Sequence, residues 1–199
     1  MKFKLRYLIY GIIGLVIILI SVLLKFNVNT TIGNSNIVAV DFKNDMKIEK
    51  SFTSLYNDLN KIGIKFATYM SKNNQGVMNV RIIDNSNNLE IYNQDIKLKN
   101  IVDNEFYYFD FNNQKESKNK EYKIIIKVKE MDDDTNIGIW GDYSLDEMVK
   151  VDAKAIDKDY VIMVNGKNND YKLLLCLAFY GVIIAMIEIL KENGGKVRK

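Results

Sequence analysis

The amino-acid sequence predicts a mainly β protein, an antiparallel, jelly-roll-like β-sandwich flanked by two transmembrane α-helices, and three observations lead to this fold class. The length of 199 residues suits one domain of ordinary size and a few shorter segments. Through the middle of the chain, apolar and polar residues alternate with a period of two, as a sheet with one buried face requires. Near the two ends lie two mainly apolar runs of 18 residues each.

The two apolar runs are Tyr7–Leu24 and Leu173–Leu190. A helix of this length extends about 27 Å, close to the thickness of a bilayer's hydrocarbon core. A buried core helix would show a polar stripe, which neither run has. No small-residue cleavage site follows the first run, so an uncleaved anchor is expected. The expected parts are a cytoplasmic N-terminus (1–6), a transmembrane helix (7–25), an extracytoplasmic β-sandwich domain (26–171), a second transmembrane helix (172–190) and a cytoplasmic tail (191–199).

The distribution of charge predicts on which side of the membrane each part lies. Three basic residues precede the first run, and the tail beyond the second run carries four basic residues and one acidic residue. The 26–171 segment holds 19 basic and 23 acidic residues. Because short segments rich in Lys and Arg stay on the cytoplasmic side, we expect a cell-membrane protein with both termini in the cytoplasm and the lipid bilayer as a partner. The basic ends lack interleaved aromatic residues, so nucleic-acid binding is not expected.

Eight short strands are expected in the middle segment, separated by clusters of Asn, Asp, Gly and Ser. The alternation is clear around Ile62, Ile64 and Phe66, which share one side of their strand and are expected to face the core. Ser54–Leu59 fits a single turn of helix. The expected strands are Ile37–Phe42, Lys61–Met70, Met78–Asp84, Leu89–Tyr92, Phe106–Phe111, Tyr122–Val128, Ile137–Trp140 and Tyr160–Val164.

The composition argues against the common kinds of catalysis. The chain has no histidine, which excludes Ser-His-Asp and Cys-His nucleophilic sets. Its single cysteine, Cys176, excludes a disulfide framework and a CxxC redox pair. No glycine-rich loop of the phosphate-binding kind occurs. We therefore expect a protein that is not an enzyme and that needs no cofactor.

Six short motifs follow one another between Ile48 and Gly141: IEKSFTS, LNKIGIKFATYMSKNNQG, VRIID, DNEFYYFDF, EYKIIIKV and NIGIW. Their combination resembles the carbohydrate-binding-module-like jelly-roll domains of large bacterial membrane proteins of surface-polysaccharide assembly, including glycosyltransferase-type proteins. The chain lacks the many-span catalytic body of those proteins, so the resemblance implies the sandwich and no transferase activity. The matching positions are Ser51, Phe52, Ile64–Tyr69, Asn74, Gly76, Asp84, Asp103, Asn104, Tyr122, Ile139 and Trp140.

Four aromatic residues are candidates for binding a polysaccharide: Tyr69, Tyr107, Trp140 and Tyr143. Sugars present flat C–H faces that stack on exposed aromatic rings, while nearby amides and acids bond their hydroxyl groups. By alternation, Trp140 lies opposite the isoleucines of its strand, and Tyr69 and Tyr107 fall on positions expected to face away from the core. The alternatives are that Trp140 plugs the rim of the sandwich and that the tyrosines make ordinary cross-strand contacts.

An acidic loop is the candidate for a structural calcium ion. Asp132 and Asp134, together with Asn136, supply the hard oxygen ligands that calcium prefers. Their spacing does not reproduce an EF-hand loop, and a solvated acidic turn explains the same residues.

The function expected from the sequence is that of a non-catalytic membrane protein whose outward β-sandwich recognises or presents cell-surface polysaccharide. It would act as an accessory to polysaccharide synthesis or export, beside a larger polysaccharide-assembly membrane protein. This role follows mainly from the resemblance. The alternative is a membrane adaptor whose sandwich binds the outer domain of another membrane protein and no sugar.

Overall fold

The computed structural model describes residues 26–71, 74–144 and 149–168, together with residues 12, 14, 16, 179–183 and 186. No helix formed by these residues is both long and apolar enough to cross a membrane. The predicted cytoplasmic segments at 1–6 and 191–199, and most of the predicted spans at 7–25 and 172–190, lie outside the described residues. Contacts between Cα atoms divide the chain into two compact units, residues 27–167 and residues 1–26 with 168–199.

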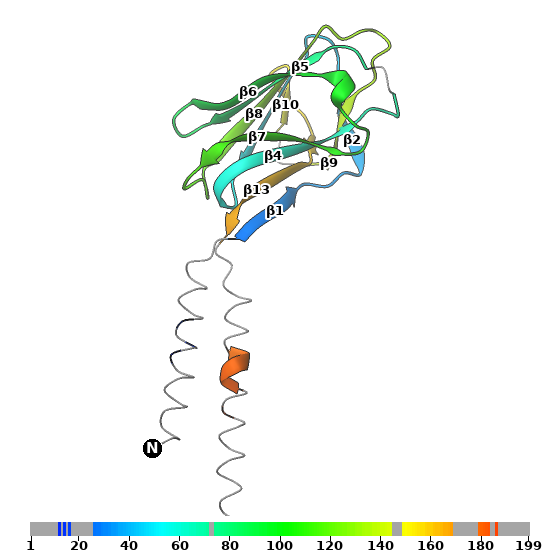
Figure 1. Ribbon diagram of the computed structural model, residues 1–199. Helices are drawn as coiled ribbons and strands as arrows, with labels where there is room; N and C mark the ends of the chain where they lie inside the picture. Colours follow the sequence, from blue (N-terminus) through cyan, green and yellow to red (C-terminus); the bar gives the residue numbers. More distant parts are fainter. Residues whose placement is uncertain are drawn as a thin grey trace, which may run out of the picture. The chain divides into compact units, whose positions relative to one another are not determined.

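Two sheets form a β-sandwich in the first unit, which confirms the mainly β fold class (Figure 1). In its described residues, a seven-stranded sheet has the order β1-β13-β4-β9-β12, with β2 beside β9 and β7 beside β4. A six-stranded sheet has the order β11-β10-β3-β8-β5-β6. The pairings with an assigned register are antiparallel. The strands are β1 (Phe26–Ile32), β2 (Ile37–Asp41), β3 (Lys47–Thr53), β4 (Asn57–Ala67), β5 (Val77–Asp84), β6 (Leu89–Lys97), β7 (Phe106–Gln114), β8 (Glu121–Lys129), β9 (Gly138–Tyr143), β10 (Val149–Val151), β11 (Lys154–Ala155), β12 (Lys158–Tyr160) and β13 (Ile162–Asn168), with a short 3-10 helix, η1 (Leu98–Asn100), between β6 and β7.

The core lies between the sheets and is built from the inward positions of their strands. Ile62, Ile64 and Phe66 on β4 are all 0% exposed, as the alternation predicts. The same period of two buries every second residue of β5 and β8, including Met78, Val80 and Ile82 on β5 and Tyr122, Ile124, Ile126 and Val128 on β8. Burying these side chains stabilises the sandwich by about 1.5–3 kcal/mol for each large apolar residue.

Aromatic rings bridge the two sheets along one side of the sandwich. Tyr92 on β6 makes edge-on contacts with Phe109 and Phe111 on β7, with ring centroids 5.6 and 6.4 Å apart. Such contacts add about 0.5–1.5 kcal/mol each beyond the area they bury. They hold together the edges at which β6 and β7 lack a further strand in the described part of the chain.

A buried lysine links the sheets elsewhere. Lys50 occupies an inward position of β3 and is 1% exposed. Its Nζ donates to Oδ1 of Asp159 and to the backbone oxygen of Tyr160, each at 2.5 Å, and lies 4.8 Å from the centroid of the Tyr160 ring. Burial lowers the pKa of Lys50 and the charge of Asp159 opposes that shift. The ion pair therefore compensates the cost of a charge placed in the core.

The structure differs from the expected elements in several places. Residues 57–59 begin β4 and form no helical turn, because the left-handed φ of 56° at Asp58 and a register shift near Leu59 place a bulge there. The expected strand Lys61–Met70 ends at Ala67, since Tyr69 and Met70 have left-handed φ values of 52° and 61°. The expected strand Tyr160–Val164 is divided between β12 and β13, which pair with different strands. Strands β1, β3, β10 and β11 were not among the expected elements.

The first and last strands of the sandwich are neighbours in the same sheet. Strands β1 and β13 are hydrogen-bonded to each other, although they come from opposite ends of the domain's sequence. Figure 1 shows that β1 begins and β13 ends at the same end of the sandwich.

Candidate functional site

The outer face of the seven-stranded sheet carries basic and aromatic side chains around a glycine. On β4 the outward positions, which alternate with Ile62 and Ile64, are Lys61, Gly63 and Lys65. Phe106 on β7 is directly opposite Lys65 in the register, and the next outward residues of β7 continue beside Gly63 and Lys61. A small residue thus lies between two lysines at the centre of this face.

Two aromatic rings from β7 lie over Gly63. A Cβ placed on Gly63 would be 2.9 Å from the ring of Tyr108 and 3.3 Å from that of Phe106, so the rings occupy the space that a side chain would take. The two rings stack on each other, with centroids 6.3 Å apart and an interplanar angle of 26°. Tyr108 is 43% exposed. The sheet therefore presents an aromatic surface with ring area open to a ligand.

Polar groups surround this surface. Tyr108 donates from its hydroxyl group to Sδ of Met163, on β13, at 3.4 Å. The Nζ of Lys61 lies 5.3 Å from the centroid of the Tyr108 ring and 3.0 Å from Oδ1 of Asp110. Asp110 has a 68% exposed side chain, so its carboxylate remains accessible as an acceptor. Stacking surface, ammonium donors and a carboxylate acceptor are thus combined on one face.

Trp140 extends the same face toward β9. Its neighbour Ile139 is buried in the core, so Trp140 points outward, and it is partly buried. The Nζ of Lys65 lies 5.9 Å from the centroid of the Trp140 ring, a distance compatible with a cation–π contact. The indole N–H is buried and has no acceptor among the described residues. Trp140 therefore presents its ring, and no exposed N–H group, to a ligand.

We call the residues that form this surface the aromatic face. They are Lys61, Gly63, Lys65, Phe106, Tyr108, Asp110, Trp140 and Met163.

The structure places Tyr107 on the side opposite to the one predicted. Tyr107 packs against the core beside Phe109, with ring centroids 5.4 Å apart. Phe109 is 0% exposed, which fixes the inward side of β7. The reason for the error is that aromatic residues occupy both sides of this strand, so alternation of apolar character does not reveal its orientation. The outward aromatic residues, Phe106 and Tyr108, were missed; the glycine within a strand was the available signal for them.

Tyr69 and Tyr143 are exposed, as expected for ligand-binding rings, but neither belongs to the aromatic face. Tyr69 is 52% exposed, follows the end of β4 and donates a short hydrogen bond to Asp41. Burial of its hydroxyl group and the bond to Asp41 raise the pKa of Tyr69 to about 12. Tyr143 is 68% exposed at the end of β9, with the Nζ of Lys158 5.9 Å from its ring centroid.

A small pocket lies beside Tyr69. It has a volume of about 280 Å³ and is lined by Asp41, Phe42, Tyr69, Thr135, Asn136 and Ile137. The predicted candidates Tyr69 and Asn136 therefore share this pocket. The predicted site is accordingly divided between several places on the domain.

The acidic loop, the candidate for calcium, lies at the surface. Asp132 and Asp134 are exposed, and the side-chain amide of Asn136 donates to the backbone oxygen of Asp134 at 3.3 Å. No group of three or more His, Cys, Asp or Glu side chains that could hold a metal ion occurs in the described part of the chain. Calcium binding by this loop therefore stays a prediction from the sequence.

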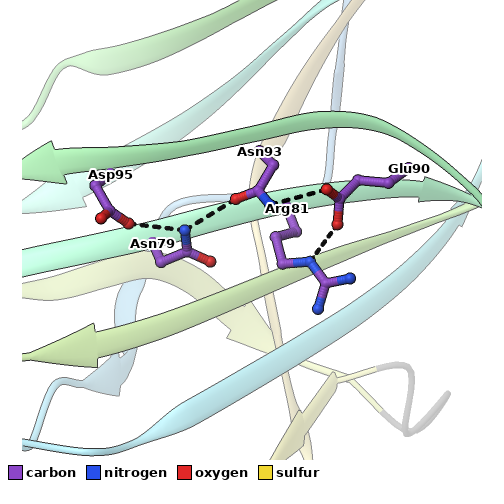
Figure 2. A network of polar contacts seen from close by, with 5 residues as sticks. All are labelled: Asn79, Arg81, Glu90, Asn93 and Asp95. Atoms are coloured by element: carbon purple, nitrogen blue, oxygen red, sulfur yellow. Dashed lines mark hydrogen bonds and ion pairs between the residues drawn. The ribbon is translucent and has the colours of Figure 1, made fainter.

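The outer face of the six-stranded sheet differs from the aromatic face. Figure 2 shows a polar network across β5 and β6. Asn79 donates to Asn93 at 3.0 Å and to Asp95 at 2.7 Å, Asn93 donates to Glu90 at 2.8 Å, and Nε of Arg81 donates to Glu90 at 2.5 Å. Hydrogen bonds from Arg81 and Asn93 lower the pKa of Glu90. These groups already pair with one another, and the outward positions of β3, β5 and β8 contain no aromatic residue.

The comparisons with known proteins show only weak similarity. No protein-family model matches the chain, and no curated protein matches it. Among solved structures, the chain is similar to a structure of the infectious bursal disease virus Gx strain, with 8% identity and a TM-score of 0.33 over 74% of this chain. That similarity spans 33% of the viral chain.

A second similar structure is a carbohydrate-binding module, CBM28, that is specific for non-crystalline cellulose. The identity is 13% and the TM-score 0.22, over 59% of this chain and 70% of the module. At these values, the ligand of the module says nothing about the ligand of this chain.

Proposed function

We propose that the β-sandwich binds polysaccharide through the aromatic face, and that the chain is a non-catalytic accessory of surface-polysaccharide synthesis or export. The observation that carries the proposal is the stacked pair of Phe106 and Tyr108 rings lying over Gly63. Exposed area of an aromatic ring presents the flat apolar surface on which the C–H face of a sugar stacks. The absence of a side chain on Gly63 allows this arrangement.

The polar groups beside the rings supply the directional part of recognition. Lys61 offers ammonium donors, and Asp110 an exposed carboxylate that accepts hydrogen bonds from sugar hydroxyl groups. Because the Lys61–Asp110 pair is largely exposed, it contributes little to stability, and its atoms can exchange partners at small cost. The aromatic face therefore combines a stacking surface with replaceable polar contacts.

The membrane part of the proposal rests on the sequence. The two apolar runs support a two-pass protein of the cell membrane, and the basic residues at both ends support cytoplasmic termini with the sandwich outside. The lipid bilayer and a larger polysaccharide-assembly membrane protein are the proposed partners.

Affinity electrophoresis of the full-length chain in detergent micelles, through gels containing different polysaccharides, tests the binding site. Retardation by at least one polysaccharide is expected. In Tyr108→Ala the affinity should fall about tenfold, because one stacking contact is lost. Ile125→Ala is the matched control, since Ile125 lies at an outward position of β8 on the other sheet. If Tyr143→Ala weakens the retardation and Tyr108→Ala leaves it unchanged, the binding site lies outside the aromatic face. Failure of every polysaccharide would favour the adaptor role.

Labelling of intact cells tests the proposed location. With Cys176 replaced by Ala, Lys127→Cys introduces one thiol at an exposed position of β8. A maleimide that does not cross membranes should label this thiol in intact cells. The same reagent should label Lys196→Cys, in the tail, only after permeabilisation. The opposite pattern would refute the topology.

A further inference from the structure

We infer that the polysaccharide bound by the aromatic face is acidic, and that Lys65 binds its anionic group. The inference rests on the binding function proposed above and concerns the chemical class of the ligand.

Lys61 and Lys65 have different partners. Lys61 has an acidic partner on the neighbouring strand, with Nζ 3.0 Å from Asp110. Lys65 donates to Oγ of Ser35 at the long distance of 3.4 Å and faces the Trp140 ring at 5.9 Å. Among the described residues, no carboxylate lies within ion-pair distance of Lys65. One partly buried cation on this face thus has no counter-charge within the part of the chain that the structure describes.

The register places this cation next to the stacking rings. Lys65 is directly opposite Phe106 across the β4–β7 pair, and Gly63 is directly opposite Tyr108. Side chains opposite each other in antiparallel strands have Cβ atoms about 4.5–5.5 Å apart. A substituent on a sugar ring stacked over Phe106 and Tyr108 would therefore come within reach of the Lys65 ammonium.

An anion is the substituent that this position favours. A partly buried ammonium has lost some of its hydration, and a hydroxyl group would accept a hydrogen bond from it without supplying an opposite charge. A carboxylate or phosphate would accept the same hydrogen bond and also neutralise the ammonium, which adds the Coulomb attraction between the two charges. The ring of Trp140 contributes an attraction to the cation but cannot neutralise it. The shared chemistry is therefore a sugar polymer that carries anionic groups.

The test compares polygalacturonate with its fully methyl-esterified form, which has the same backbone without the charges. Affinity electrophoresis of the full-length chain should show at least about tenfold tighter binding of the acidic form. In Lys65→Met this preference should disappear, and Lys65→Arg should keep the preference. Lys127→Met is the control for a lysine on the other sheet. A phosphate-containing polymer is tested in parallel. If it binds more tightly than the methyl ester and this difference depends on Lys65, the result also supports the inference and identifies phosphate as the anionic group.

The outcomes separate this inference from the binding function itself. The inference of an acidic ligand is wrong if the acidic and esterified forms bind equally, or if Lys65→Met leaves the preference intact. Either result leaves the proposed function standing. Binding of neutral polysaccharides alone would have the same meaning. If no polysaccharide binds, the inference and the proposed function both fail.

Discussion

Removing the charge of Asp159 tests the ion pair that joins the two sheets. In Asp159→Asn, the Lys50 ammonium keeps the backbone oxygen of Tyr160 as an acceptor but loses its counter-charge. Lys50 is 1% exposed, so water cannot replace the carboxylate. Breaking a buried pair from one side costs about 3–5 kcal/mol in general. Since the Asp159 side chain is 19% exposed, we expect a loss at the lower end, about 3 kcal/mol.

Thermal unfolding of the full-length chain in detergent, followed by the fluorescence of the one tryptophan, Trp140, measures this loss. A loss of 3 kcal/mol corresponds to roughly 10 °C in the midpoint for a domain of this size. Asp157→Asn is the control because Asp157 is exposed, and it should stay within about 0.5 kcal/mol of the wild type. Adding Lys50→Met to Asp159→Asn should recover most of the loss, since an apolar chain of similar length then replaces the buried charge.

The pH dependence gives a second readout. Burial lowers the pKa of Lys50 below 10.5, and the charge of Asp159 limits that shift, so the pKa falls further in Asp159→Asn. Between the lowered pKa and 10.5, the unfolded chain binds a proton that the folded variant does not, and stability then rises with pH. The deficit of Asp159→Asn should therefore be full below the lowered pKa of Lys50 and shrink as the pH rises from there toward 10.5. A loss no larger than that of Asp157→Asn would refute the reasoning.

Three further predictions concern single positions. In Gly63→Val the new Cβ displaces the Tyr108 ring, so polysaccharide retardation should fall about tenfold while the unfolding midpoint stays nearly unchanged; normal binding would contradict this. Gly76→Ala should lower the free energy of unfolding by about 3 kcal/mol, measured by thermal unfolding, because Gly76 has a φ of 116° and a Cβ added there would lie 2.9 Å from a backbone oxygen. A loss below about 1 kcal/mol would contradict this prediction. The pKa of Tyr69 is raised to about 12 by burial of its hydroxyl group and by the hydrogen bond to Asp41, so the contribution of this group to stability is present below pH 10 and is lost as the pH rises toward 12. Ultraviolet titration of Asp41→Asn should therefore show a phenol ionising nearer pH 10. An unchanged titration would argue against the bond.

The sequence predicts those strands that have one purely apolar side. Ile62, Ile64 and Phe66 alternate with polar or small residues, and the structure buries all three, as predicted. Strand β3 was missed because Lys50 occupies an inward position and makes its alternation look polar. Its partner, Asp159, is 109 residues away in the sequence, and no local pattern connects the two.

The candidate site was predicted only in part, for a related reason. Trp140 lies on an outward position of its strand, as its alternation predicts. The run Phe106–Phe109 is aromatic throughout, so the pattern alone cannot tell which rings face the core. The answer depends on the register of β7 against β4, which places Tyr108 beside Gly63. Cross-strand register of this kind is a tertiary property that periodicity within one strand does not contain.

The adjacency of β1 and β13 has a mechanical consequence. Strand β1 begins and β13 ends at the same end of the sandwich (Figure 1). Tension applied through the two ends of the domain therefore separates this pair of strands progressively from that end. Its hydrogen bonds would then break one after another, whereas a pull from opposite ends would load them all at once. Strand β1 would peel away under a small force, while the tightly packed strand β4 would resist until much later.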